Sequence, residues 1–338
     1  MIGAGQAGLS SAYFLRRADL DFVVLDDNAR PGGAWQYRWP TLRMATVHGI
    51  FDLPGMHFDP PPDEAPAAEA VPAYFAAYER EFDLPIERPV HVRAVRHGQE
   101  DRLLVHTDDG EWAARAVINA TGTWRTPFWP HYPGQETFLG RQLHTADYRG
   151  PAEFAGRQVV VVGGGSSAVQ LLAEIDEVAT TTWVTRRPPV FRDGPFDADH
   201  GRAIVAMVDE RVRAGLPPDS VVSATGLVAT PAAVAASRRR LPMFDRITPD
   251  GVAWDDGRFV PADVILWCTG WRASLDHLAP LRLREPGGGI RMDGTRVVAE
   301  PRLHLVGYGP SASTVGANRA GRQAVKEIRE LLRVPART

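Results

Sequence analysis

Residues 3–17 read GAGQAGLSSAYFLRR, a glycine-rich turn that runs directly into an amphipathic helix pattern. The apolar stretch at residues 22–25 follows and ends at Asp26. Glycines at the GxGxxG spacing allow a tight turn, a close approach of a pyrophosphate to backbone N–H groups, and close packing of the helix on its strand. A carboxylate at the end of the next strand can accept hydrogen bonds from a ribose. The stretch therefore predicts most of a dinucleotide-binding βαβ unit, with a glycine turn that serves packing alone as the alternative.

A second unit has the same order of parts. Residues 157–168 read RQVVVVGGGSSA, an apolar strand pattern followed by another glycine turn, and a helix pattern leads to a strand pattern at residues 180–185. Thr185 takes the place of the ribose carboxylate, and Arg186 and Arg187 follow it. Because a guanidinium matches a 2′-phosphate that a carboxylate would repel, the pair favours NADPH over NADH. A solvated arginine pair is the alternative.

The second turn also resembles the nucleophile elbow of α/β-hydrolases at residues 164–168. Ala168 stands where the elbow carries its second glycine, and Gly163 completes the dinucleotide spacing. The dinucleotide interpretation is therefore favoured over a hydrolase.

The first unit lacks room for a full opening strand. Only Met1 and Ile2 precede the glycine turn, whereas a strand at this place usually has about five residues. We therefore expect a chain that is shortened at its start. Whether such a chain retains the cofactor at its first glycine turn is an open question.

Composition limits the classes of partner. The chain has 338 residues, 44% hydrophobic and 23% charged, which is ordinary for a globular protein with two cored domains. The formal net charge of -3 provides no basic field for nucleic acid or an anionic membrane, and no apolar run approaches the roughly 20 residues that span a bilayer. We expect small-molecule partners, no nucleic-acid or membrane partner, and a cytoplasmic location.

The small numbers of cysteine and lysine residues exclude further classes of enzyme. Cys268 is the only cysteine, so a disulfide framework and a CxxC redox pair within one chain are excluded. Lys326 is the only lysine, which argues against a Schiff-base enzyme. The histidines show no metal-ligand spacing, so we expect no metal site. The run Arg238–240 is most simply a solvated helix end.

The order of patterns predicts an α/β fold with two Rossmann-like dinucleotide-binding domains, each with three layers and a mainly parallel sheet. An NADP-binding domain at residues 150–265 is inserted in an FAD-binding domain made of residues 1–149 and 266–338. Helical patterns at about residues 197–240 predict an insertion in the NADP-binding domain, which we interpret as a lid or the surface of a homodimer.

Two short turns end further apolar strands, at residues 120–122 (ATG) and 268–270 (CTG). Small residues there let the backbone pass close to a cofactor where the chain crosses between two domains. Trp124, Trp129 and Trp271 lie beside these turns, and either line a substrate pocket or belong to the core.

The segment between the two fingerprints carries a longer motif. Phe138, Gly140, His144 and Tyr148 match FxGxxxHxxx(Y/F), the signature of the class B flavin monooxygenases, which the chain resembles. The resemblance also includes the GGxW loop at residues 32–35 and both TG turns, and so covers nearly the whole chain. The tyrosine distinguishes the chain from the Baeyer–Villiger branch, whose pattern carries tryptophan at this position.

The resemblance implies an enzyme in which NADPH reduces FAD and the reduced flavin activates O2 to oxygenate a small soft nucleophile at nitrogen or sulfur. Together with the fingerprint it assigns to FAD the residues Gly3, Gly5, Gln6, Gly8, Asp26, Gly33, Trp35, Val92, Ala120, Thr121, Gly122 and Gly307. The residues assigned to NADPH, or to the contact between the domains, are Gly163, Gly165, Ser166, Ser167, Arg186, Arg187, Thr269 and Gly270.

The catalytic residues stay open. N-oxygenating members of the family place an asparagine near the flavin, and the corresponding residues 42–48 (LRMATVH) have none, which leaves Thr46 and His48 as candidates. His144 is a third candidate, although we interpret it rather as an interdomain hydrogen bond. Two alternatives remain: an NADPH-dependent flavin reductase or diaphorase that passes electrons to a quinone or disulfide, and a flavin-binding protein without turnover.

Overall fold

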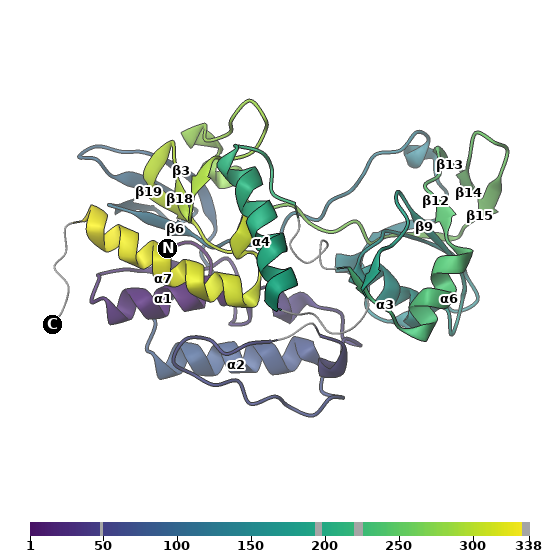
Figure 1. Ribbon diagram of the computed structural model, residues 1–338, viewed down its shortest axis with the longest axis horizontal. Coiled ribbons are helices and arrows are strands. Elements are labelled where there is room, and N and C mark those ends of the chain that lie inside the picture. The colour runs from purple at the N-terminus through teal and green to yellow at the C-terminus, as the bar shows by residue number, and fades with distance from the viewer. Residues whose placement is uncertain (48–49, 193–197, 220–225, 333–338) are drawn as a thin grey trace.

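The computed structural model describes residues 1–47, 50–192, 198–219 and 226–332. Two lobes lie side by side, each built around strands that run parallel (Figure 1). Helices cover one face of each sheet, and a small antiparallel sheet covers the other. The chain therefore has an α/β fold with parallel sheets, as the sequence predicts.

Ile2 lies in the centre of the first lobe's sheet. It forms parallel bridges to Leu25 on one side and to Asn119 on the other, and so joins a pair of strands to a sheet of four. In order across the sheet the strands are β2 (Ile86–Glu87), β1 (Val24–Leu25), then β6 (Val117–Asn119), β19 (Glu300–Leu305), β18 (Arg296–Val297) and β17 (Met292–Asp293). The two residues before the glycine turn thus occupy the position of the opening strand.

Apolar residues on neighbouring positions of β6 serve the two faces of this sheet. Ile118 packs with Leu15 of α1 (Gln6–Arg17) and Val325 of α7 (Thr314–Leu331). Val117 packs on the opposite face, because side chains alternate along a strand. That face is covered by the antiparallel strands β3 (Val92–His97), β4 (Leu103–Thr107) and β5 (Glu111–Ala114).

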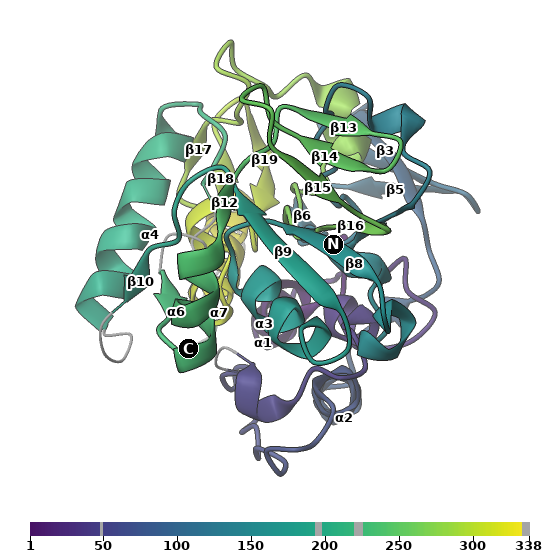
Figure 2. The ribbon, with the colours of Figure 1, turned by 90° about the vertical axis from the view of Figure 1, so that its right-hand side faces the viewer.

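The second lobe has a five-stranded sheet in which all strands are parallel. Its order is β12 (Leu241–Pro242), β9 (Thr180–Thr185), β8 (Gln158–Val162), β16 (Val264–Trp267) and β7 (Arg141–His144). Figure 2 shows this sheet between two helices and an antiparallel sheet. The covering elements are α3 (Ser166–Ile175), α6 (Pro231–Arg239), β13 (Arg246–Thr248), β14 (Gly251–Ala253) and β15 (Phe259–Pro261).

Burial of both faces explains the run of four valines in β8. Val159 and Val161 pack with the residues of α3, whereas Val160 and Val162 pack with Ile247 and other residues under the antiparallel sheet. A strand that is covered on both faces needs apolar side chains at every position. Such a strand does not alternate between apolar and polar residues.

The insertion that we expect at about residues 197–240 contacts both lobes. Its first helix, α4 (Ala198–Arg213), lies against the first lobe, where Val212 joins the core beneath β6 and packs near Gly309 (Figure 1). Helix α6, further along the insertion, packs with α3 and β9 in the second lobe. The short strands β10 (Phe191–Arg192) and β11 (Leu227–Val228) pair with each other. Among the described residues, no helix is both long and apolar enough to cross a membrane.

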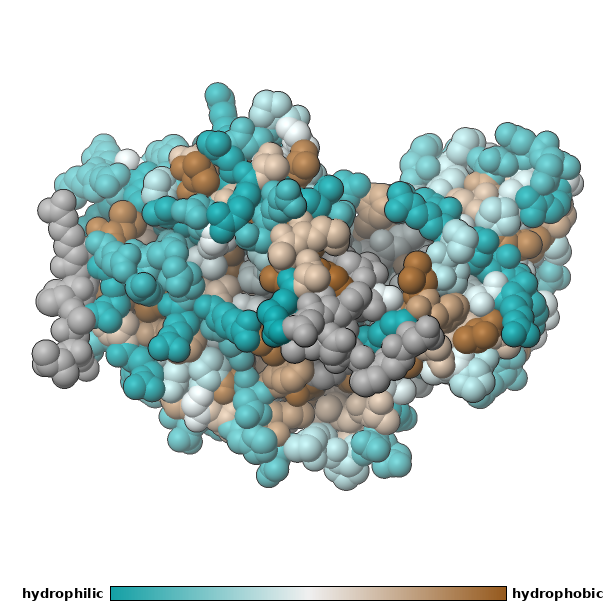
Figure 3. Space-filling model, in the orientation of Figure 1, coloured by the Kyte–Doolittle hydropathy of each residue, from teal (hydrophilic) through white to brown (hydrophobic). Residues whose placement is uncertain are grey.

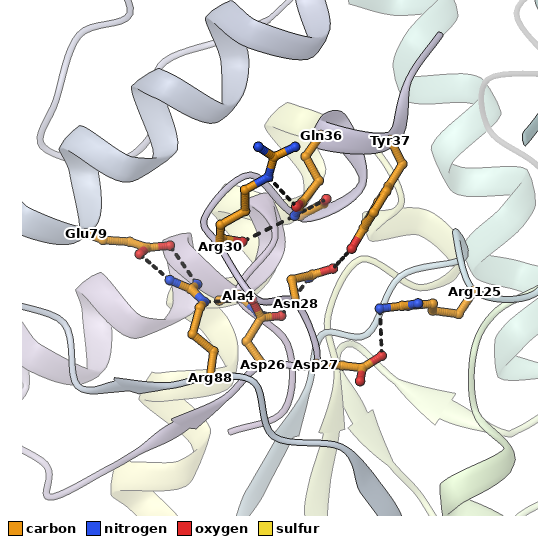
Figure 4. Close-up of polar contacts among 11 residues, drawn as sticks. Ala4, Asp26, Asp27, Asn28, Arg30, Gln36, Tyr37, Glu79, Arg88 and Arg125 are labelled. Carbon is orange, nitrogen blue, oxygen red and sulfur yellow. Dashed lines mark hydrogen bonds and ion pairs between the residues drawn. The ribbon is translucent and has the colours of Figure 1, made fainter. Parts of the chain in front are cut away.

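A buried ionic network fixes the end of β1 to helix α2 (Ala67–Glu81) (Figure 4). Arg88 donates from Nε to Asp26 Oδ2 at 3.1 Å, and from its two Nη atoms to the carboxylate of Glu79 at 2.6 and 2.9 Å. Asp26 Oδ1 accepts from the backbone N–H of Ala4 at 3.3 Å and from Asn28 Nδ2 at 3.0 Å. One guanidinium thus connects the glycine turn, the first lobe's sheet and α2.

We predict that Arg88→Met destabilises the fold, because it leaves two buried carboxylates without their cation. The side chains of Arg88, Asp26 and Glu79 are 12, 4 and 11% exposed, and loss of one partner of a buried pair costs on the order of 3 kcal/mol. Urea unfolding should show this loss. Arg93→Met is the matched control, because Arg93 pairs with Asp108 on the surface, where ion pairs contribute little. Equal effects of the two substitutions would contradict the prediction.

Candidate functional site

The glycines of the first turn divide into two kinds. A Cβ atom on Gly3 would lie 2.6 Å from the carbonyl oxygen of Ala120, and one on Gly8 would lie 2.0 Å from that of Gly3. Packing therefore requires these two glycines. A Cβ on Gly5 would meet no atom nearer than 3.9 Å. The chain itself does not require a glycine at position 5, whereas a group bound against the turn would.

The second turn repeats this division. A Cβ on Gly163 would lie 2.2 Å from the carbonyl oxygen of Cys268. A Cβ on Gly165 would meet nothing within 4 Å. Ala168, at the third position of the fingerprint, is fully buried. Both turns therefore pack on a TG turn with their first glycine and leave open space at their second.

Each open glycine is also the N-cap of a helix. Gly5 precedes α1 and Gly165 precedes α3, and neither helix has a side-chain cap or an acidic residue in its first turn. The first N–H groups of such a helix can bind an anion, which the helix dipole favours. Gln6 Nε2 is also buried without a hydrogen-bond acceptor among the described residues. These features fit a dinucleotide pyrophosphate at each glycine turn. In the second one, Ser166 and Ser167 lie in the first helical turn of α3. We call each glycine turn, together with the N-terminus of the helix that follows it, a glycine cradle.

The two TG turns begin the segments that cross between the lobes. Gly122 and Gly270 have φ values of +63° and +78°, and a Cβ on either would meet nothing within 4 Å. The crossing segments run antiparallel and pair through three backbone hydrogen bonds of 2.8 to 2.9 Å, which are Phe128 N to Gly270 O, Arg272 N to Thr126 O, and Ser274 N to Gly122 O. Thr121 and Thr269 each donate a hydroxyl hydrogen bond across this pair.

His144 binds this pair of segments to the second lobe. Its Nδ1 accepts from the backbone N–H of Ala146 at 3.1 Å, so its Nε2 carries the hydrogen and donates to the carbonyl of Gly270 at 3.0 Å. Burial lowers the pKa of His144. With both ring nitrogens engaged by the backbone, this imidazole holds the segment that leaves β16 against the end of the neighbouring strand β7 in the same sheet. The interdomain role that we expect for His144 stays a prediction.

The signature tyrosine makes a second contact between the lobes. The hydroxyl of Tyr148 donates to Glu174 Oε2 at 2.8 Å, and the hydroxyl of Thr41 donates to the same oxygen at 2.6 Å. Glu174 lies on α3, whereas Thr41 follows the GGxW loop. The signature tyrosine therefore shares one carboxylate oxygen of α3 with the segment that follows the GGxW loop.

Of the other two candidate catalytic residues, Thr46 and His48, the structure describes only Thr46. Thr46 is exposed, its hydroxyl donates to the carbonyl of Arg43 at 3.0 Å, and its own carbonyl accepts from Gln170 Nε2 of α3 at 2.9 Å. His48 lies outside the described residues. Beside Thr46 is a pocket of about 520 Å³, which is lined by Met44, Val47, Ile50, Phe51, Asp52, His57, Phe58 and Pro60.

The remaining predicted FAD residues belong to the first lobe. Trp35 lies in the 3-10 helix Gly33–Tyr37, and a Cβ on Gly33 would lie 2.7 Å from Gly5 Cα. Val92 is the first residue of β3, and a Cβ on Gly307 would lie 3.1 Å from Ala7 Cβ of α1. Asp26 lies at the end of β1 as expected, but its carboxylate already accepts three hydrogen bonds from the chain.

Three arginines lie around the end of β9. Arg186 and Arg187 are exposed, as a phosphate site requires. Arg240, which the sequence indicated only as part of a solvated helix end, donates from Nη1 to Thr185 Oγ1 at 3.2 Å. Arg240 lies at the end of β9 because β12 pairs with β9 and aligns Pro242 with Thr185. This non-local pairing had no signal in the sequence.

Comparisons with known proteins agree with this geometry. The family model described as pyridine nucleotide-disulphide oxidoreductase matches residues 1–283. A solved flavin-containing monooxygenase from Stenotrophomonas maltophilia is 40% identical, with 98% of this chain and 97% of that chain covered and a TM-score of 0.83. A solved cyclohexanone monooxygenase, 18% identical with a TM-score of 0.68 over 98% of this chain and 87% of that chain, shares the fold.

Curated relatives match over a shorter range. An uncharacterized oxidoreductase CzcO from Bacillus subtilis is 32% identical over 181 residues, which are 54% of this chain and 52% of that protein. A senecionine N-oxygenase from Tyria jacobaeae is 22% identical over 207 residues, or 53% and 44% of the two chains. The chain spans about half the length of the curated relatives it matches.

Flavin monooxygenases of this class use FAD and NADPH. The two glycine cradles, the shared architecture and the family match over most of the sequence lead to one conclusion. The chain is an oxidoreductase of the pyridine nucleotide-disulphide oxidoreductase family and belongs, within it, to the flavin monooxygenases.

Proposed function

We propose that this protein is an FAD- and NADPH-dependent monooxygenase that transfers one oxygen atom of O2 to a small soft nucleophile at nitrogen or sulfur. The observation that carries the proposal is the repeated cradle, in which Gly5 and Gly165 open onto an uncapped helix N-terminus. When bound, FAD would accept the hydride of NADPH and activate O2, so the chain has to bind, orient and shield the two dinucleotides.

We assign FAD to the first cradle and NADPH to the second. In support, the first cradle lies between the GGxW loop and the first TG turn, while three arginines lie at the end of the strand that follows the second. The corresponding division is an FAD-binding domain of residues 1–149 and 266–338 and an NADP-binding domain of residues 150–265, both Rossmann-like. The insertion is best treated separately, since α4 packs on the first lobe.

A disulfide reductase, which the family name also covers, does not suit this chain. Cys268 is the only cysteine, and burial raises the pKa of its thiol to about 12. Reactive thiols are accessible and have lowered pKa values. The chain has no second thiol with which to form a redox dithiol, so electron transfer to O2 or to an external acceptor is favoured.

The pocket beside Thr46 suits a small substrate with an apolar body. Among the described lining residues six are apolar, and the polar ones are Asp52 and His57, which pair at 3.0 Å. The hydrogen bond that His57 donates to the carboxylate of Asp52 raises the pKa of His57. We propose this pocket as the substrate site. A cytoplasmic location and a homodimer stay predictions; the single cysteine agrees with a reducing compartment.

The test of the function is the balance of oxygen and electrons. With methyl phenyl sulfide as probe, we expect NADPH, a proton, O2 and the sulfide to yield NADP⁺, water and the sulfoxide in equal amounts. One atom from ¹⁸O2 should appear in the sulfoxide by mass spectrometry. NADPH oxidation with an added quinone but without labelled sulfoxide would instead indicate a diaphorase.

A pair of glycine substitutions should separate cofactor binding from folding. We predict that Gly5→Ala folds with an unchanged melting temperature but does not retain FAD, because its φ of −78° suits alanine and its Cβ enters only the open space. Gly8→Ala, the control, should unfold, because its Cβ would lie 2.0 Å from Gly3 O. Flavin absorbance and thermal melting measure both effects, and a yellow Gly5→Ala protein would count against the first cradle.

Arg186→Ala should weaken NADPH binding roughly tenfold or more while NADH binding hardly changes, because a charge-assisted hydrogen bond to the 2′-phosphate is lost. Titration of the FAD-loaded protein under anaerobic conditions measures both affinities. Arg157→Ala, an exposed arginine at the start of the same unit, is the control. Equal losses for NADPH and NADH would remove the assignment of the phosphate site.

A further inference from the structure

Arg38 lies in a cage of three tryptophans. Its guanidinium carbon is 5.4 Å from the ring centre of Trp35, 5.1 Å from that of Trp124 and 5.6 Å from that of Trp271. The rings of Trp124 and Trp271 are stacked on each other at 5.1 Å. Aromatic faces attract a cation but give its N–H groups no hydrogen-bond acceptor of normal strength.

The guanidinium has no anionic partner in the described part of the chain. Arg38 forms no ion pair and no side-chain hydrogen bond there, and its Nε is fully buried without an acceptor. Burial lowers the pKa of Arg38 to about 10. Its neighbour Arg125, by contrast, pairs with Asp27 at 2.9 Å. A buried cation without a partner costs free energy, so its retention indicates an acceptor that the described residues do not supply.

The cage lies between the two glycine cradles. Trp35 belongs to the 3-10 helix that packs on Gly5, and Trp124 follows the first TG turn. Trp271 follows the second TG turn, whose first residue packs on Gly163. Its Nε1 is a second buried donor without an acceptor among the described residues. Figure 3 shows a notch between the lobes with hydrophobic residues beside it. Trp124 and Trp271 belong to the segments that cross between the lobes, so a ligand that reaches from one cradle to the other would pass close to them.

We propose that Arg38 binds the phosphate of the nicotinamide half of NADPH, and thereby directs that half from the second cradle toward the flavin. The inference rests on the proposed function, in which NADPH occupies the second cradle. A dinucleotide bound at α3 would have one phosphate on the side of each of its halves. The half that extends toward the first turn would bring its phosphate past the crossing segments, where Trp124 and Trp271 lie. Arg186, at the end of β9, would hold the other end of the same molecule.

A purely structural role makes a different prediction. If Arg38 only joined the three rings, its removal would loosen the contact between the lobes and lower the melting temperature. If it is kept for a ligand, an apolar side chain of similar length should fill the cage without its desolvation cost. Arg38→Met therefore separates the two roles.

The experiment is a calorimetric titration of the FAD-loaded protein with two ligands, NADP⁺ and 2′,5′-ADP, which lacks the nicotinamide half. We expect Arg38→Gln and Arg38→Met to weaken NADP⁺ binding about ten- to a hundredfold and to leave 2′,5′-ADP binding unchanged. Arg186→Ala should weaken both ligands. Arg38→Lys should recover part of the NADP⁺ affinity, since it keeps the charge but not the planar fork. Arg43→Gln, an exposed arginine of the same segment, should change neither.

Two results would overturn the inference: wild-type affinity for NADP⁺ in Arg38→Gln, or a melting temperature of Arg38→Met that falls while NADP⁺ affinity is kept. A failure of the proposed function is recognised separately. In that case the unchanged protein binds neither ligand, or binds 2′,5′-ADP equally well without Arg186.

Discussion

The contact on which both lobes depend is that of a glycine Cα with a carbonyl oxygen of a TG turn. Gly3 packs on Ala120 and Gly163 packs on Cys268, each so closely that a Cβ would lie within 2.6 Å of the carbonyl oxygen. This contact sets each glycine turn directly against the segment that leaves the lobe. Because both leaving segments pair with each other, the two cradles are tied to one ribbon of backbone, and their separation follows from the hydrogen bonds of that ribbon.

This arrangement gives the family signature a physical meaning. His144 donates to Gly270 in the crossing segments, and Tyr148 shares Glu174 with Thr41 of the other lobe. The first contact joins the ends of two neighbouring strands, and the second joins helix α3 to the segment after the GGxW loop. Both contacts fix backbone beside the crossing segments, and hydride transfer between two dinucleotides is sensitive to small displacements of its donor and acceptor.

The local parts of the fold could be predicted from the sequence. Glycine turns, the apolar run of β8 and the amphipathic helices α1 and α3 all have signals within about 30 residues, and the structure places them as expected. The strands β13 to β15 and β7 had weaker signals, because they are short and owe their stability to burial against the second sheet. The position of α4 on the first lobe could not be predicted, since nothing in an amphipathic pattern says which of two cores its apolar face will meet.

The residues of the candidate site also differ in whether the sequence could predict them. The glycines of the cradles, such as Gly5 and Gly165, could be predicted from the sequence, because the spacing of the motif itself determines where they lie in the turn. The positions of Arg240 and Arg38 could not be predicted, because each depends on contacts between segments that are distant in the sequence. Arg240 is placed by the pairing of β12 with β9. Arg38 is placed by tryptophans from both segments that cross between the lobes. Asp26 is the opposite case. Its position at the end of β1 was predicted, but its burial beneath Arg88 was not. A ribose bound at this cradle would have to share a carboxylate that already supports the fold.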